Sequence, residues 1–322
     1  MQGKFIEIHA AAEYIGPGAI EVPLYQSEIT DIVRRRGMFG QRIKCVPATG
    51  HPSRFFEDTP YEDIPTGTSE KPGIGRVRYN PARRERSVPL KAIVAEINYN
   101  LFDMELGKQQ SQFAYLQAKD LADTVDGVMR THDVALWNGC DTSLNAPTTA
   151  EYYGAAGQIA AGGNTTTIGT TQSIVDGIKH AVAEMMANGA SMGTRPTAIY
   201  ANPVLLDLID REMKTELNVV LETVQLESGF SVKVLTTQAG KLPLIPDWTL
   251  SYTGTPGSGS AILPAYIVTE DLIEYHWLSD PSPRIFQMGV PGSLASKYVV
   301  VKFGGLVVKC ARTAHRQVLT ER

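Results

Sequence analysis

The chain has 322 residues, of which 43% are hydrophobic and 20% are charged. These proportions are typical of an ordered protein that can hold two ordinary domains, and they exclude a disordered chain. The formal net charge of −4, from 30 Lys and Arg against 34 Asp and Glu, argues against a dedicated nucleic-acid-binding protein.

The first 49 residues are expected to form an extended arm followed by a short helix. Apolar residues between positions 15 and 25 favour an arm that packs on another surface, and a disordered tail is the alternative. Ser27–Arg36 begins with a good helix cap and ends in three consecutive arginines, which suit the negative end of a helix dipole. We interpret these arginines as a solvated helix end in preference to a phosphate site. No apolar run has the length or position of a signal peptide or a membrane span.

Residues 50–95 read as a long two-stranded excursion with prolines and glycines at its middle. Its charges are segregated between the two limbs. The acidic residues of the first limb are Glu57, Asp58, Glu62, Asp63 and Glu70, and the basic residues of the return limb are Arg76, Arg78, Arg83, Arg84, Arg86 and Lys91, with only Glu85 opposing them. A lone hairpin is marginally stable in water, so we expect it to contact a neighbouring subunit. Internal pairing of the two limbs is the alternative.

A strand over Val88–Asp103 is expected to lead into one long amphipathic helix over Gly107–Asn138. The residues of its apolar face are Phe113, Leu116, Leu121, Val125, Val128 and Leu136. No proline interrupts the pattern, and Gly139 stands where a C-terminal cap glycine is common. At 1.5 Å per residue, this helix would be roughly 45–50 Å long. The apolar positions keep no strict seven-residue repeat, which argues against a coiled coil and favours a structural spine.

The Gly/Thr-rich stretch Gly154–Thr171 predicts a flexible loop between two domains. After it, helices and strands alternate over residues 172–285, as in a compact α/β unit. Asn202-Pro203 predicts the start of a helix, with Asn as the cap and Pro as the first helical residue. Gly240–Pro246 reads as a stiff loop. Near the end, Gly304-Gly305 predicts a short hairpin or a sharp bend between two strands.

The usual catalytic and metal-binding patterns are missing from the sequence. There is no GxxxxGK[ST], HExxH or GxSxG motif, and the three separated cysteines form no CxxC pair. His180 and Glu184 share a helix face, and we interpret them as an ordinary polar pair. We therefore expect no catalytic residue, no cofactor and no metal site.

The order of these elements, together with three local stretches, carries a family resemblance. The stretches are Leu136–Gly139 (LWNG), Thr197–Pro203 (TAIYANP) and Thr237–Pro246 (TQAGKLPLIP). The chain resembles the major capsid proteins of tailed double-stranded DNA phages, which have the Hong Kong phage-type fold. The resemblance implies an α+β fold with an N-terminal arm and helix (1–49), an E-loop (50–95), a P domain with the spine helix (96–150 and 286–322) and an A domain (151–285).

The resemblance implies a structural shell protein that assembles into hexamers and pentamers around double-stranded DNA, which it contacts without sequence specificity. The implied partners are many copies of the chain, a portal and, in some members, scaffold and cement proteins, with no membrane. Assembly would occur in the bacterial cytoplasm and the protein would reside in the virion capsid. An encapsulin-type compartment is the first alternative, and a cytosolic α/β enzyme is the second.

Overall fold

The computed structural model divides the chain into two units, Met1–Arg34 and Arg35–Arg322. The residues that the structure describes are 37–58, 83–100, 114–187, 194–215, 221–225, 231–255, 259–289 and 295–322, all in the second unit. The predicted arm and the predicted helix over Ser27–Arg36 lie outside these residues. None of the described helices is both long enough and apolar enough to cross a membrane.

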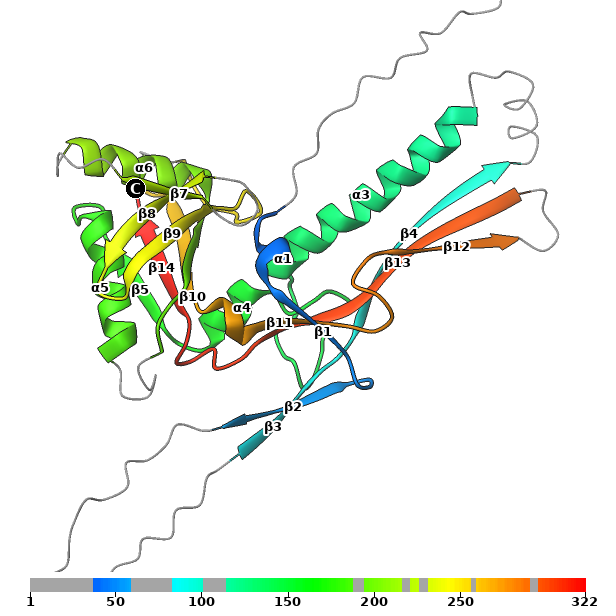
Figure 1. Ribbon diagram of the computed structural model, residues 1–322, viewed down its shortest axis with the longest axis horizontal. Coiled ribbons are helices and arrows are strands. Elements are labelled where there is room, and N and C mark those ends of the chain that lie inside the picture. Colours follow the sequence, from blue (N-terminus) through cyan, green and yellow to red (C-terminus); the bar gives the residue numbers. More distant parts are fainter. Residues whose placement is uncertain are drawn as a thin grey trace, which may run out of the picture. The chain divides into compact units, whose positions relative to one another are not determined.

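One of the two large sheets is built around a single long strand, β13 (Figure 1). Its strands are β1 (Lys44–Pro47), β4 (Lys91–Asn100), β11 (Ile273–Trp277), β12 (Arg284–Gly289) and β13 (Ala295–Val308). β4 pairs with β13 in antiparallel register from residue 295 to residue 304. The opposite edge of β13 is shared, first by β12 and then by β11. β1 joins the sheet in parallel beside β11.

The spine helix is confirmed over α3 (Ala114–Asn138), which has 25 residues and lies against β4. Along β4, exposed residues alternate with half-buried residues that face α3. Tyr99 is one of the half-buried residues, and its hydroxyl donates a hydrogen bond to Asp120 of α3 at 3.3 Å. Val128 and Leu136 are buried. Leu121 and Val125 are half-buried, Phe113 lies outside the described residues and the side chain of Leu116 is not described.

The helix ends where the sequence predicts, but Gly139 is not a left-handed cap. Its φ is not positive, although its N–H still donates to the carbonyl of Ala135 at 3.0 Å. A Cβ at Gly139 would lie 2.4 Å from the carbonyl oxygen of Tyr152. The glycine is therefore required by the close approach of the chain around Tyr152, and not by the conformation of a helix cap.

The second sheet has seven strands and is covered by α5 (Ile174–Ala187) and α6 (Pro203–Thr215). In order across the sheet the strands are β5 (Thr165–Ile168), β14 (Arg316–Glu321), β10 (Ile262–Val268), β6 (Ala198–Ala201), β9 (Gly240–Pro246), β8 (Ser231–Thr237) and β7 (Glu222–Gln225). The N-cap at Asn202 is confirmed, because its side-chain oxygen accepts the N–H of Val204 at 3.0 Å. His180 and Glu184 form an ordinary polar pair on α5, 3.2 Å apart.

Two apolar clusters lie on opposite faces of this sheet. Ile199 and Ala201 point to the cluster beneath α5 and α6, whereas Ala198 and Tyr200 point to the other. The second cluster also contains residues of α1 (Phe39–Arg42), α4 (Ala155–Ala161), the end of α3 and β11. In it the rings of Phe39 and Trp137 are 4.1 Å apart. This cluster therefore ties the spine helix to the seven-stranded sheet.

Three predictions about local structure are wrong. Gly154–Thr171 is not one flexible loop, since it contains α4 and β5. Gly240–Pro246 is strand β9, because its two halves pair with different neighbours, β8 and β6. Of the two alternatives at Gly304-Gly305, the hairpin is wrong, because β13 runs through both residues as one strand; a Cβ at Gly304 or Gly305 would collide with Tyr275 or Val88.

The strand pairings place β14 and β11 in different sheets from those expected from the predicted domain boundaries. β14 follows residue 286 in the chain, yet it pairs with β10 and β5 in the seven-stranded sheet. β11 falls within residues 151–285, yet it pairs with β13 and β1 in the five-stranded sheet. The chain crosses between the two sheets more often than the sequence indicates.

Candidate functional site

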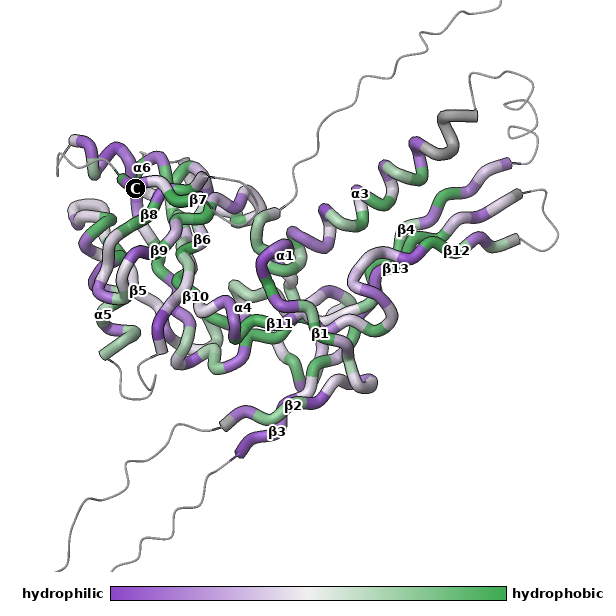
Figure 2. Tube along the Cα trace, in the orientation of Figure 1, coloured by the Kyte–Doolittle hydropathy of each residue, from purple (hydrophilic) through white to green (hydrophobic). Residues whose placement is uncertain are grey.

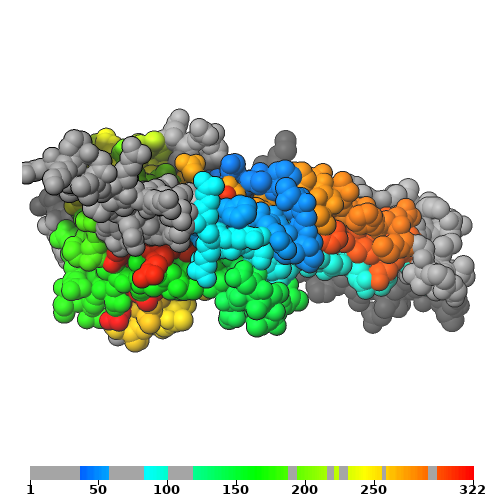
Figure 3. Space-filling model, turned by 90° about the horizontal axis from the view of Figure 1, so that it is seen from below, coloured from blue at the N-terminus to red at the C-terminus, as the bar shows by residue number. Residues whose placement is uncertain are grey.

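The candidate site is the base of the predicted excursion, where β2 (Ser53–Asp58) and β3 (Arg83–Val88) form a two-stranded antiparallel sheet. In the register Glu57 lies opposite Arg84, and Asp58 lies opposite Arg83. Figure 3 shows residues 37–58 (blue) beside the cyan atoms of the segment that begins at residue 83, on one face of the molecule. The two-stranded prediction is confirmed for these residues. Glu62, Asp63, Arg76 and Arg78 lie outside the described residues.

One face of this hairpin carries a large exposed aromatic side chain. Phe56 is 71% exposed and lies opposite Glu85. Glu85 forms an exposed ion pair with Arg54 at 3.2 Å. β3 is almost entirely hydrophilic (Figure 2), and its residues Arg83 and Glu85 share this face with Phe56. An exposed Phe framed by charges is the kind of side chain that anchors protein–protein contacts.

The other face of the hairpin is tied to the chain's own body. Ser53 Oγ lies 2.8 Å from His276 Nδ1, and the Phe55 ring lies 6.4 Å from the His276 ring. Glu57 pairs with Arg86 at 2.8 Å and also accepts the backbone N–H of Cys310. For Arg86 the internal pairing of acidic and basic limbs, the alternative in the sequence analysis, is therefore present.

The buried carboxylate of Glu274 contacts two of the residues on which the hairpin packs, Lys309 and His276. It accepts a hydrogen bond from Lys309 at 2.6 Å and lies 3.2 Å from His276. Burial alone would raise the pKa of the Glu274 carboxyl, but Lys309 and His276 outweigh burial, so its pKa lies below the ordinary value. Burial also lowers the pKa of His276. These residues were missed by the sequence analysis because they lie more than 200 positions from β2.

A second candidate surface lies on the five-stranded sheet, on the face turned away from α3. The alternation of β4 and the register with β13 and β12 place Val94, Phe286 and Met288 on this face. They are 56%, 40% and 49% exposed, and the neighbouring Val299 and Val301 add two nearly buried side chains. Glu96 and Lys297 form an ion pair across the two strands beside them. Exposed apolar side chains on β4 and β12, with buried valines of β13 between them, are typical of an interaction surface.

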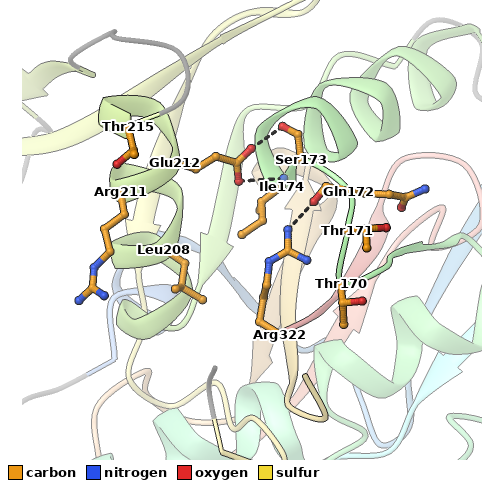
Figure 4. Close-up of a pocket in the computed structure, with 10 residues that line it drawn as sticks. All are labelled: Thr170, Thr171, Gln172, Ser173, Ile174, Leu208, Arg211, Glu212, Thr215 and Arg322. Carbon is orange, nitrogen blue, oxygen red and sulfur yellow. Dashed lines mark hydrogen bonds between the residues drawn. The ribbon is translucent and has the colours of Figure 1, made fainter. Parts of the chain in front are cut away.

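A polar pocket of about 360 Å³ lies between α6, the start of α5 and Arg322 (Figure 4). Glu212 accepts from the hydroxyl of Ser173 and from the N–H of Ile174 at 2.9 Å, and Arg322 donates to the carbonyl of Gln172. Glu212 and Arg322, two charged residues that line the pocket, are therefore bonded to the segment Gln172–Ile174. Among the described residues no three His, Cys, Asp or Glu side chains gather as metal ligands would.

No protein-family model matches the chain, and no curated protein matches its sequence. Solved structures do match over nearly the whole chain. A chain of Gordonia phage Cozz aligns with TM-score 0.61 and 15% identity, over 100% of this chain and 99% of that one. The capsid of a native GTA particle aligns with TM-score 0.64 and 12% identity, over 98% and 100%.

An encapsulin also matches. The holo-SrpI encapsulin complex of Synechococcus elongatus PCC 7942 aligns with TM-score 0.55 and 14% identity, over 92% of this chain and 95% of that one. At these identities the matches report the fold. The long helix against a strand pair, the hairpin and the α/β unit together give this chain the Hong Kong phage-type capsid fold that the sequence resemblance predicts.

Proposed function

We propose that the chain is the major capsid protein of a tailed double-stranded DNA phage, a structural protein without catalytic activity. The observation that carries the proposal is the hairpin on a chain with the capsid fold. One face of the hairpin is hydrogen-bonded to the rest of the subunit, and the other face carries Phe56, which is 71% exposed. A side chain so placed gains little from the subunit's own core and is available to a neighbouring copy.

The partners we propose are further copies of the chain, arranged as hexamers and pentamers of a closed icosahedral shell. Each copy adds weak contacts that closed symmetry multiplies. A portal, and scaffold or cement proteins where the virus has them, would complete the particle. With a net charge of −4, contact with the packaged DNA would be sparse and independent of sequence. Assembly would take place in the host bacterial cytoplasm.

The intersubunit contacts that we propose run through the hairpin. They involve Phe56, Asp58, Arg83 and Arg84 among the described residues, and Glu62, Asp63, Arg76 and Arg78 at the tip. Glu57 and Arg86 were also predicted to reach a neighbour, and their pairing with each other supports a role within the hairpin instead. The exposed face at Val94, Phe286 and Met288 is a second contact surface of the shell.

The domains that we propose are those that the resemblance implies: an arm and helix (1–49), an E-loop (50–95), a P domain (96–150 and 286–322) and an A domain (151–285). The strand pairings support moving β11 to the P domain and β14 to the A domain. The A domain then contains the complete seven-stranded sheet.

Negative-stain electron microscopy of the purified protein tests the proposal. We expect closed icosahedral particles, or rings of five and six subunits. A monodisperse small oligomer at every protein concentration would contradict the capsid function and favour the α/β enzyme.

The encapsulin-type compartment is the second candidate, because one encapsulin shell shares the fold. Particles from the native source would separate the two functions. Protection of double-stranded DNA from added nuclease is expected of the capsid, whereas a protein cargo without DNA would establish the compartment.

A further inference from the structure

The turn between β13 and β14 touches the hairpin at its root. Lys309 Nζ lies 5.7 Å from the centre of the Phe55 ring and donates to Glu274 at 2.6 Å. The next residue, Cys310, donates its backbone N–H to Glu57. Two consecutive residues of one turn therefore contact two residues of β2.

The backbone of this turn is held in an unusual conformation. Cys310 has a φ of 52°, and it is the only non-glycine residue of the described chain in the left-handed region. Such a conformation is costly for a side chain with a Cβ and persists only where the surroundings fix it. Here the Cys310 carbonyl accepts the N–H groups of Thr313 and Ala314, each at 2.9 Å, and His315 Nε2 lies 3.1 Å from the carbonyl of Lys309. The turn is thus fixed by bonds that do not involve the hairpin.

The contacts of β2 with the body follow its alternation. Ser53, Phe55 and Glu57 share one face of the strand, and they meet His276, Lys309 and Cys310 respectively. Along a strand these three positions span roughly 13 Å. A strand held at both ends of such a line cannot pivot about a single point.

We propose that the turn Lys309–Ala314 is a latch that sets the direction of the hairpin in the free subunit, with Glu57 and Lys309 as its positioning residues. Glu57 is suited to this role because one carboxylate joins both strands of the hairpin, through Arg86, to the strained turn. A hairpin directed in advance would lose less conformational freedom when a neighbour binds it. Only this last consequence rests on the proposed shell function.

The test is hydrogen–deuterium exchange of full-length, unassembled subunits, read separately for peptides of the hairpin and of the seven-stranded sheet. Two variants break contacts of the latch, and two others, Glu85→Ala and Lys309→Arg, are expected to keep them. Glu57→Ala removes the carboxylate that bonds to Arg86 and to the N–H of Cys310. Lys309→Met removes the ammonium charge but keeps an apolar side chain over Phe55. Glu85→Ala is the matched control. Glu85 lies on the same hairpin and pairs only with the exposed Arg54 among the described contacts.

We expect about tenfold faster exchange of the hairpin amides in Glu57→Ala and Lys309→Met, with unchanged exchange in the seven-stranded sheet. Glu85→Ala should match the wild type, and Lys309→Arg should restore most of the protection. Hairpin exchange at the wild-type rate in both latch variants would overturn the proposal. Equal acceleration in both sheets would also overturn it, because the residues would then support the fold as a whole. Since free subunits are measured, neither result depends on whether particles form.

Discussion

The buried carboxylate of Asp247 accepts hydrogen bonds from three separate segments of the chain. It is fully buried and accepts hydrogen bonds from Phe39 N–H at 3.2 Å, Trp137 Nε1 at 3.1 Å and both the N–H and the hydroxyl of Thr249. The donors come from α1, the end of α3 and the turn after β9. This residue links three segments that are 2, 110 and 208 positions away from it.

We expect Asp247→Ala to lower the free energy of unfolding by about 3 kcal/mol or more, because it leaves several buried donors without an acceptor. Urea unfolding followed by tryptophan fluorescence would measure the loss. Glu222→Ala is the control, because Glu222 and its partner Lys241 are both exposed and such pairs contribute about 0–1 kcal/mol. A loss at Asp247 no larger than that of the control would contradict this account.

His315 makes stability depend on pH. Its Nδ1 accepts the N–H of Thr269 at 3.4 Å, its Nε2 donates to the Lys309 carbonyl, and burial lowers its pKa to about 4. An unfolded chain takes up a proton at this residue below about pH 6.5, whereas the folded chain does not until about pH 4. The free energy of unfolding should therefore fall by about 3 kcal/mol as the pH drops through this window.

Urea unfolding at several pH values between 7 and 4.5 would check the effect of His315. His315→Gln should be less stable than the wild type at pH 7 and should lose much of the slope. Some slope will remain, because burial also lowers the pKa of His132 and of His276. Parallel curves for the variant and the wild type would contradict the assignment to His315.

At the scale of elements, α3 joins the five-stranded sheet to the apolar cluster on one face of the seven-stranded sheet. It packs against β4 with one face and ends in the cluster that holds Trp137 and Leu136. Val125 lies near its middle and is half-buried. We expect Val125→Pro to remove a backbone hydrogen bond and kink the helix, at a cost of about 3 kcal/mol or more.

Particle yield and circular dichroism of the Val125→Pro variant would test the role of the helix. We expect few or no particles and a reduced helical signal. Thr124→Ala is a matched control, because Thr124 is in the same turn and its hydroxyl only bonds back to the Asp120 carbonyl of the same helix. Normal particles from Val125→Pro would mean that the helix is not a spine.

Elements with a local signature were predictable, and those fixed by distant partners were not. α3 follows from its apolar periodicity, and the start of α6 follows from Asn202-Pro203. β9 was read as a loop because its prolines suggest one, whereas its pairing with β8 and β6 is set by strands elsewhere in the chain. Likewise, Gly304-Gly305 signals close packing against Tyr275 and Val88, which sequence alone cannot distinguish from a turn.

The same distinction applies to the candidate site. The charges of β2 and β3 and their antiparallel pairing were predictable from composition. The sequence could not predict whether Phe55 or Phe56 faces outward, because the two residues are adjacent and only the strand register assigns their faces. His276, Glu274 and Lys309 gave no signal, because their roles exist only once β11 and β13 lie beneath the hairpin.

At the scale of the whole molecule, assembly should depend on side chains that contribute little to the subunit itself. Phe56 is the clearest case. We expect Phe56→Ser to change the unfolding free energy of the subunit by less than about 0.5 kcal/mol, because the ring is already largely exposed. Particle formation should nevertheless fall strongly, because the loss recurs at every copy of the contact.

Light scattering against protein concentration, together with urea unfolding of free subunits, would separate these two effects. Arg54→Gln provides a comparison on the same face of the hairpin, since its exposed pair with Glu85 is expected to matter little. Assembly of Phe56→Ser at the wild-type concentration would show that the hairpin does not contact a neighbour through this ring.

The position of β14 within the seven-stranded sheet has a consequence for biosynthesis. β14 lies between β5 and β10, yet it is the last of the described strands to leave the ribosome. β5 pairs with β14, and this parallel pairing joins residues about 150 positions apart, which is slow to form. A nascent chain therefore cannot close this sheet until nearly all of its described residues have been made. Incomplete chains would present an open sheet edge at β10, and such an unpaired edge favours aggregation of a nascent chain.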